Sequence, residues 1–255
     1  MSSSPNTLRV ATRGSRLALR QTELVIELLR SLEPGVDFEI VTVTTTGDRD
    51  RRSYAEIGGR GLFVREVEEA LLDDRADLAV HSAKDLTSGL APGCVIAGVP
   101  ARAPVEDVVL GAGDDRDGGV RLTELRPGSK VGTSSMRRRA LLAEARRDLD
   151  IVEFRGNLDT RLEKVERGDV DAAIVAAAGL ERLGLDLANY GRLDPDVWTP
   201  APAQGALAVE ALDNRTAVLD LVAGIDDDAA RAEVTLERAF SAVLEGGCTV
   251  PLGCL

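Results

Sequence analysis

Residues 78–85 read Leu78-Ala79-Val80-His81-Ser82-Ala83-Lys84-Asp85, a short apolar run that passes directly into polar residues of catalytic type. The apolar residues predict the end of a buried strand. In an open α/β sheet, ligands bind just beyond the carboxyl ends of strands, so this position suits a site. A polar turn that merely follows a core strand explains these eight residues equally well. His81 is the only histidine of the 255-residue chain.

The same order of strand, polar turn and helix recurs on both sides of this segment. It is found three more times, with arginine and glycine, hydroxyl or amide residues in the turn: at Leu8–Ser15, Lys130–Arg139 and Asp150–Asn157. A fully apolar strand is expected over Ala172–Ala178, and a helix over Ala229–Leu244 with Leu236, Phe240 and Val243 on its apolar face. Repeated strand–helix alternation predicts an α/β fold with mainly parallel strands, in two sheets with a break near residue 100.

The polar turns carry side chains that suit anions. Only Lys84, Lys130 and Lys164 are lysines among 31 basic residues. A GC-rich genome would give the same bias, but arginine is also the side chain that pairs bidentately with carboxylate or phosphate. The N–H groups at a helix start would strengthen such a site. At Ser15, an ordinary helix cap is the simpler alternative.

Composition excludes several classes of function. The net charge of −12 argues against nonspecific nucleic-acid binding. The chain has no apolar run long enough for a membrane span, residues 1–6 lack a signal-peptide pattern, and three cysteines form no even disulfide framework. We therefore expect a cytoplasmic protein without a metal. A hydrolase built from Ser82, His81 and Asp85 is possible, but the chain has no Gly-x-Ser-x-Gly elbow.

Seven segments of the chain, taken in order, resemble the porphobilinogen deaminase (hydroxymethylbilane synthase) family. They are Ala11–Ser15, Gly58–Phe63, Val80–Asp85, Val131–Arg138, Arg155–Leu162, Gln204–Ala206 and Glu245–Cys248. Each segment is weak by itself, whereas seven in the family's order are specific. The resemblance implies a transferase of tetrapyrrole (haem-type) biosynthesis. It would join four porphobilinogen molecules head to tail, release ammonia at each step and yield hydroxymethylbilane.

The resemblance also implies roles for individual residues. A dipyrromethane cofactor would be held through a thioether to Cys248, and Asp85 would be the catalytic carboxylate that stabilises pyrrole cations and relays protons. The other cofactor-binding residues would be Lys84, Ser15, Thr133, Ser135, Arg137 and Arg138. The substrate-binding residues, which face its acetate and propionate groups, would be Arg13, Gln21, Ser82, Arg155, Arg161 and Arg182.

By the same resemblance, the fold would consist of two α/β domains like those of periplasmic binding proteins, with a cleft between them. Domain 1 would comprise residues 5–100 and 200–220, and domain 2 residues 105–198. Residues 226–255 would begin a small α+β third domain that carries the cofactor cysteine and is truncated here. Residues 48–61 would form a mobile loop. The protein would be a monomer whose partners are porphobilinogen and the growing polypyrrole.

The chain departs from the family's pattern at two positions near the predicted site. Thr87 stands where the family has a proline, and Glu106 stands where it has a cation. The short third domain raises the question of whether the chain is a fragment or a natural short form. Two alternatives therefore stay open: a noncatalytic anion-binding protein of the same architecture, and an inactive remnant of the enzyme.

Overall fold

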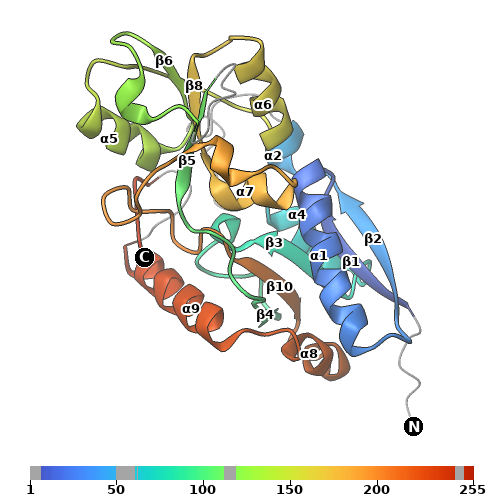
Figure 1. The fold of residues 1–255 in the computed structure, drawn as a ribbon. Helices are drawn as coiled ribbons and strands as arrows, with labels where there is room; N and C mark the ends of the chain where they lie inside the picture. Colours follow the sequence, from blue (N-terminus) through green and yellow to red (C-terminus); the bar gives the residue numbers. More distant parts are fainter. Residues whose placement is uncertain (1–6, 50–60, 62, 112–118, 245–249) are drawn as a thin grey trace. The chain divides into compact units, whose positions relative to one another are not determined.

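The computed structural model describes residues 7–49, 61, 63–111, 119–244 and 250–255, and the chain divides into two compact units. Unit 1 consists of Met1–Arg102 and Ala206–Gly247, and unit 2 of Ala103–Gly205 with Cys248–Leu255. Each unit contains one five-stranded sheet with helices packed against it (Figure 1). The helix that precedes Cys248 belongs to unit 1, and the third domain expected from residue 226 stays a prediction.

Unit 1 is built on a sheet with the strand order β2-β1-β3-β10-β4. β1 is parallel to β2 and β3, whereas β10 is antiparallel to β3 and β4. A 3-10 turn, Ala83–Asp85, follows β3 directly. The elements are β1 (Thr7–Arg13), α1 (Arg16–Leu32), β2 (Asp37–Val43), α2 (Thr46–Arg49), α4 (Arg65–Leu72), β3 (Leu78–Ser82), β4 (Cys94–Gly98), β10 (Leu207–Leu212), α8 (Thr216–Ala223) and α9 (Asp228–Val243).

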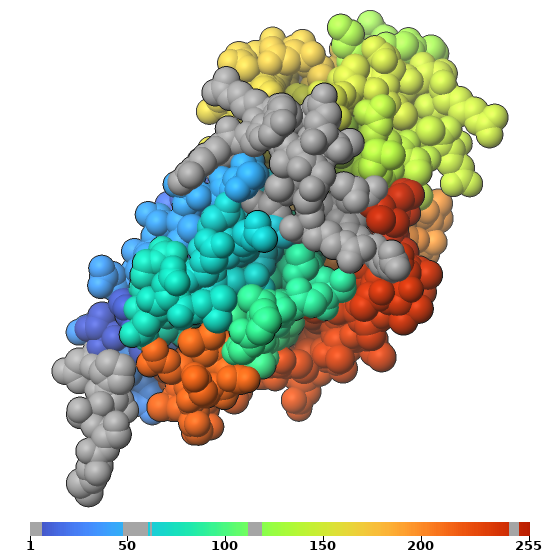
Figure 2. All heavy atoms as spheres, turned by 180° about the vertical axis from the view of Figure 1, so that it is seen from behind, coloured from blue at the N-terminus to red at the C-terminus, as the bar shows by residue number. Residues whose placement is uncertain are grey.

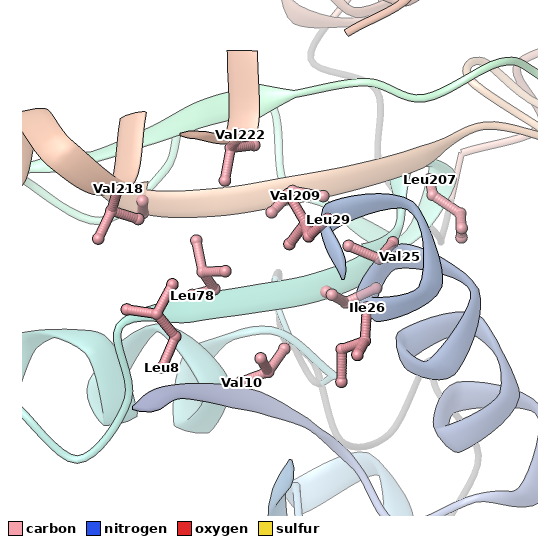
Figure 3. Close-up of a cluster of buried hydrophobic side chains, with 12 residues drawn as sticks. Leu8, Val10, Val25, Ile26, Leu29, Leu78, Leu207, Val209, Val218 and Val222 are labelled. Atoms are coloured by element: carbon pink, nitrogen blue, oxygen red, sulfur yellow. The ribbon is translucent and has the colours of Figure 1, made fainter. Parts of the chain in front are cut away.

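The core of unit 1 lies between its sheet and α1 (Figure 3). Val10, Leu78 and Val209 come from three adjacent strands and are fully buried under Val25 and Leu29 of α1. Because side chains of a strand alternate between faces, the next residue along each strand faces the other side, where α4 packs. The sheet is therefore covered on both faces, and its strand ends are held in fixed positions.

Unit 2 is built on a sheet with the strand order β7-β6-β8-β5-β9. β6 is parallel to β7 and β8, and β5 is antiparallel to β8 and β9. Helices α6 and α7 pack on one face and α5 on the other. The elements are β5 (Asp107–Gly111), β6 (Lys130–Gly132), α5 (Met136–Ala145), β7 (Asp150–Val152), α6 (Leu158–Glu166), β8 (Ala172–Ala176), α7 (Ala177–Arg182) and β9 (Gly191–Arg192), with 3-10 turns at Leu122–Glu124 and Leu187–Asn189.

Both sheets are mainly parallel, as expected, and in each of them one strand runs against the other four. β5 and β10 run against their neighbours in the two sheets. Neither strand is entered through a helical crossover, the connection that makes neighbouring strands parallel. One correction concerns the apolar run from Ala172. Its strand ends at Ala176 and α7 begins at Ala177, because alanine favours helices and is depleted in strands.

The packed face of α9 also differs from the expected one. Leu236 and Val243 are 71% and 82% exposed, and Phe240 is exposed as well, whereas Val234 and Glu237 are buried. Atoms of α9, drawn in orange-red, are accordingly visible on the surface in Figure 2. On the buried face, the Arg102 guanidinium donates to Glu237 in a bidentate ion pair at 2.7 and 2.9 Å. None of the described helices is both long and apolar enough to cross a membrane.

Candidate functional site

In unit 1, the predicted residues gather where β1 and β3 end. These strands are parallel neighbours, so their carboxyl ends lie at the same edge of the sheet. Gln21 of α1 reaches this edge, where its Nε2 donates to Ser82 Oγ at 2.9 Å. The structure thus joins two predicted substrate-binding residues that are 61 positions apart.

The turn after β1 supplies a cation and a helix start. Ser15 caps α1, since its hydroxyl accepts from the Ala18 N–H at 3.3 Å. The Arg13 guanidinium lies over the Phe63 ring, 4.2 Å from its centroid. This stacking is a cation–π contact, which fixes the plane of the guanidinium.

Asp85 ends the 3-10 turn that follows β3, and its side chain is half-buried. Among the described residues, its carboxylate has no hydrogen-bond or ion-pair partner. The turn itself is held from α9, because the Arg238 guanidinium donates to the Thr87 carbonyl at 2.8 Å. At the position where the family has a proline, this contact restrains the backbone that follows Asp85.

His81 does not belong to this edge. It lies on the opposite face of β3 from Ser82, with its Nε2 3.0 Å from the fully buried Glu210 carboxylate. Ser82 is engaged with Gln21 instead. The structure therefore does not assemble the Ser82, His81 and Asp85 hydrolase that the sequence allowed.

In unit 2, the predicted residues follow the three parallel strands β6, β7 and β8. The turns after β6 and β7 are joined by Ser134, whose hydroxyl donates to the Phe154 carbonyl at 2.8 Å and accepts from the Phe154 N–H at 3.2 Å. Gly132 is required beside them, because a Cβ there would lie 2.5 Å from the Phe154 ring. Ser135 caps α5, and the buried Thr133 hydroxyl accepts from the Ser135 N–H.

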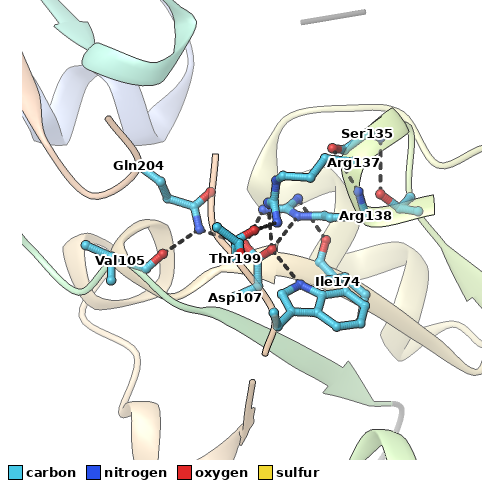
Figure 4. Close-up of polar contacts among 10 residues, drawn as sticks. Val105, Asp107, Ser135, Arg137, Arg138, Ile174, Thr199 and Gln204 are labelled. Carbon is cyan, nitrogen blue, oxygen red and sulfur yellow. Dashed lines mark hydrogen bonds and ion pairs between the residues drawn. The ribbon is translucent and has the colours of Figure 1, made fainter. Parts of the chain in front are cut away.

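A fully buried carboxylate organises the arginines that open α5 (Figure 4). Asp107 accepts from Arg137 Nη2 at 2.7 Å and from Arg138 Nη2 and Nε at 2.7 and 3.1 Å. Trp198 Nε1 and Gln204 Nε2 also donate to it, at 3.0 and 2.8 Å. We call these five residues the Asp107 cluster. Burial alone would raise the pKa of Asp107, but the two guanidinium groups outweigh it and hold that pKa far below its usual range.

The Asp107 cluster keeps the capacity to bind an anion. Two guanidinium groups share one carboxylate, which leaves one positive charge in excess. Arg137 Nε is buried and has no hydrogen-bond partner among the described atoms. Burial, with the neighbouring Arg138 charge, lowers the pKa of Arg137. Arg138, in contrast, uses each of its three guanidinium nitrogens in a bond to Asp107 or to the Ile174 carbonyl, and two of its five N–H donors remain for a ligand.

Arg182 is a second cation that lacks full compensation. Its Nη2 donates to the Gly205 carbonyl at 2.5 Å, a partner that carries no charge. Burial lowers the pKa of Arg182 to about 10. A partly buried cation of this kind would be stabilised by an anionic ligand.

The remaining arginines lie around the turn after β7. Arg161 Nε donates to the Gly156 carbonyl at 2.9 Å, and Lys164 Nζ donates to the Arg155 carbonyl at 2.9 Å. Both contacts restrain the turn that carries Arg155. Glu106, the second departure, forms an ion pair with Arg192 of β9, so the acidic replacement finds its partner within unit 2.

Some predicted features fall outside the described residues or were missed. Cys248 and most of the 48–61 loop lie outside them. Within the described ranges, no group of three or more metal-ligating side chains converges. Asp107, Trp198 and Gln204 were not predicted as parts of the site. A charged residue at the start of an apolar strand, as in Glu106-Asp107-Val108-Val109, was the available signal for Asp107.

Comparison with known proteins identifies the family. Residues 8–220 match the family model "Porphobilinogen deaminase, dipyromethane cofactor binding domain". The chain belongs to the porphobilinogen deaminase family. A porphobilinogen deaminase of a Roseiflexus species is 48% identical over 251 residues, which cover 98% of this chain and 81% of that protein. A probable porphobilinogen deaminase of Hyperthermus butylicus is 46% identical, over 96% of this chain and 80% of that one.

Solved structures agree with the fold of this porphobilinogen deaminase family member. The methionine-binding protein MetQ superposes with a TM-score of 0.52 at 15% identity, over 92% of this chain and 96% of that one. A putative lipoprotein from Ruminococcus gnavus gives a TM-score of 0.51 at 12% identity, over 95% and 98% of the two chains. The family, the periplasmic-binding-protein-like α/β fold class, the deaminase function in tetrapyrrole synthesis and the dipyrromethane cofactor are thus confirmed.

Proposed function

We propose that this chain is a transferase that condenses four porphobilinogen molecules to hydroxymethylbilane, with Asp85 as its catalytic carboxylate. One observation carries the assignment of Asp85. Its half-buried carboxylate stands at the end of β3 without a partner among the described residues, whereas Asp107, Asp77 and Glu237 are paired with arginines. A carboxylate left available at a strand end is in the position where a reacting group would bind.

The residues of unit 2 fit a cofactor that carries carboxylate groups. The excess charge of the Asp107 cluster and the unpaired Arg137 Nε both call for an anion. In this proposal Arg137 and Arg138, with Thr133 and Ser135, hold the cofactor's carboxylates. Ser15 and Lys84 assist them, and Cys248 carries the thioether. When bound, the dipyrromethane supplies the pyrrole carbon from which the product chain grows.

Asp85 would act on the incoming porphobilinogen. Loss of ammonia from the aminomethyl arm of porphobilinogen leaves a cation on that molecule. When a second pyrrole ring attacks this cation, the attacking ring becomes positively charged and must lose a proton. A carboxylate within hydrogen-bond reach of the pyrrole N–H stabilises the positive charge and accepts the proton. General acid–base groups of this kind contribute on the order of 10²–10⁴ to a rate.

Arginines and amides would bind the acetate and propionate groups of the substrate. The proposed residues are Arg13, Gln21, Ser82, Arg155, Arg161 and Arg182. A charge-assisted hydrogen bond contributes about 1.5–3 kcal/mol, so several of them hold a polyanionic chain while its reactive end changes. Among these residues, Arg182 would contribute most to the free energy of binding, because a negatively charged ligand would offset the cost of desolvating its guanidinium.

Intact-mass measurement of protein made in cells tests the proposal directly. The expected spectrum shows a mass excess of two linked pyrroles, which is lost in Cys248→Ser. Purified protein should consume porphobilinogen and release ammonia. A noncatalytic anion-binding protein would show neither the adduct nor turnover, and a folded remnant of the enzyme would bind porphobilinogen without consuming it. A monomer in the cytoplasm is part of the proposal, and sedimentation and cell fractionation would test it.

A further inference from the structure

We propose that Asp107 is a positioning residue for the carboxylate-binding arginines of unit 2, an inference that rests on the proposed function. Asp107 lies beneath the binding groups rather than among them, since its carboxylate is fully buried. It acts through Arg137 and Arg138, which are the residues proposed to touch the cofactor.

The geometry of the contacts supports a positioning role. Each oxygen of Asp107 accepts from a different arginine at 2.7 Å, and Oδ2 accepts from Arg138 Nε as well. One carboxylate therefore fixes the orientation of two guanidinium planes relative to each other. Because guanidinium groups recognise carboxylates through directed N–H bonds, their orientation determines which ligand they accept.

Two neutral donors hold Asp107 itself in place. Trp198 Nε1 binds Oδ2 at 3.0 Å and Gln204 Nε2 binds Oδ1 at 2.8 Å. Gln204 also donates to the Val105 carbonyl at 2.7 Å, which ties its amide to the backbone just before β5. The carboxylate is thus held on both sides by groups that carry no charge, so they restrain it without neutralising it (Figure 4).

A carboxylate that served only to neutralise an arginine would not need so many hydrogen bonds. Glu106, the residue immediately before Asp107, pairs with the exposed Arg192 through a single contact. In the Asp107 cluster, by comparison, five hydrogen bonds converge on one carboxylate. The two neighbouring carboxylates therefore provide a matched pair, one that fixes two proposed ligand-binding arginines and one that pairs with an arginine outside the site.

Asp107→Glu separates charge from geometry, because it keeps the carboxylate and moves it by one methylene. The variant, with Asp107→Asn and the control Glu106→Gln, is assayed for thermal melting, for the fraction of chains that carry the adduct, and for turnover per adduct-carrying chain. We expect Asp107→Glu to melt closer to wild type than Asp107→Asn. Its turnover per loaded chain should nevertheless be on the order of 10- to 100-fold lower, the cost of a group displaced by about 1 Å. Glu106→Gln should turn over like wild type.

The proposal is overturned if Asp107→Glu restores melting and turnover together, because Asp107 is then only a counter-charge. Should Asp107→Glu not fold, Trp198→Phe decides: it removes one restraint on Oδ2 and leaves both ion pairs, and wild-type turnover in that variant rejects the proposal. Absence of adduct and turnover in the wild-type chain would refute the proposed function instead, so the two failures are distinguishable.

Discussion

Asp85 and Asp107 are the same residue type in opposite environments. Asp107 opens β5, is fully buried and receives donors from two arginines, a tryptophan and a glutamine. Asp85 follows β3, is half-buried and has no partner among the described residues. A carboxylate saturated with donors can hold other groups in place, whereas an unsaturated one can receive a substrate. The environment, not the residue type, separates the positioning role proposed for Asp107 from the catalytic role proposed for Asp85.

The largest expected effect comes from Asp85→Asn. Turnover should fall roughly 10²–10⁴-fold, because the amide can neither take up a proton nor stabilise a cation. The melting temperature should stay close to wild type, since the side chain supports no described contact. Steady-state assays together with intact mass check this expectation; a mild loss of turnover would move the catalytic role to another residue.

Asp107→Asn, unlike Asp85→Asn, should strongly destabilise the fold. Removing the carboxylate leaves two buried guanidinium groups without a counter-charge, which costs about 3–5 kcal/mol of unfolding free energy. Denaturant titration measures this loss of unfolding free energy. A loss below about 1 kcal/mol would show that Asp107 supports the fold no more than Asp85 does.

Acid unfolding tests the same contrast through the depressed pKa of Asp107. A folded pKa below the unfolded one means that the stability contribution is present above the unfolded value of about 3.9 and is lost as the pH falls below it. Wild type should therefore lose stability more steeply below about pH 4 than Asp107→Asn does. If the unfolding free energies of wild type and Asp107→Asn changed with pH in the same way, the depressed pKa of Asp107 would be contradicted.

Arg182→Gln extends the comparison to a cation. Burial lowers the pKa of Arg182 to about 10, so the guanidinium stays charged at neutral pH but its burial costs folding free energy. The neutral variant should be more stable by about 0.5–2 kcal/mol, while KM for porphobilinogen rises roughly 10- to 100-fold. Thermal melts and initial rates would show whether stability and binding change in opposite directions, and an unchanged KM would exclude Arg182 from the site.

The smallest effect is expected for Arg192→Ala. This arginine is 60% exposed and pairs with Glu106, so its loss should cost less than about 1 kcal/mol and leave turnover unchanged. Chemical denaturation at low and high salt would check it. If Arg192→Ala lost as much unfolding free energy as Asp107→Asn, the exposed ion pair of Glu106 would stabilise the fold as much as the buried ion pairs of Asp107 do.

The sequence predicted the local elements better than their packing. The strand from Leu78 and the helix after Ser15 were correct because periodicity and capping are local signals. The sequence did not single out β5 and β10 as the antiparallel strands, since strand pairing is decided by residues far along the chain. The packed face of α9 was predicted wrongly: Val234 and Glu237 are buried, and Glu237 pairs with Arg102, which is 135 positions away and invisible to a local pattern.

The candidate site shows the same limit. Turn motifs predicted which residues gather at each sheet edge, because residues that follow parallel strands share an edge. They could not show that Arg138 commits its guanidinium nitrogens within the protein while Arg137 keeps an unpaired one. That difference depends on Asp107, Trp198 and Gln204, which approach from other parts of the sequence.

The hydrogen bond from Arg238 to the Thr87 carbonyl makes α9 a mechanical partner of the turn that carries Asp85. The helix ends at Val243, five positions before the cysteine predicted to bear the cofactor. The same helix therefore holds, through one contact across 151 positions of the sequence, the backbone that follows the proposed catalytic carboxylate.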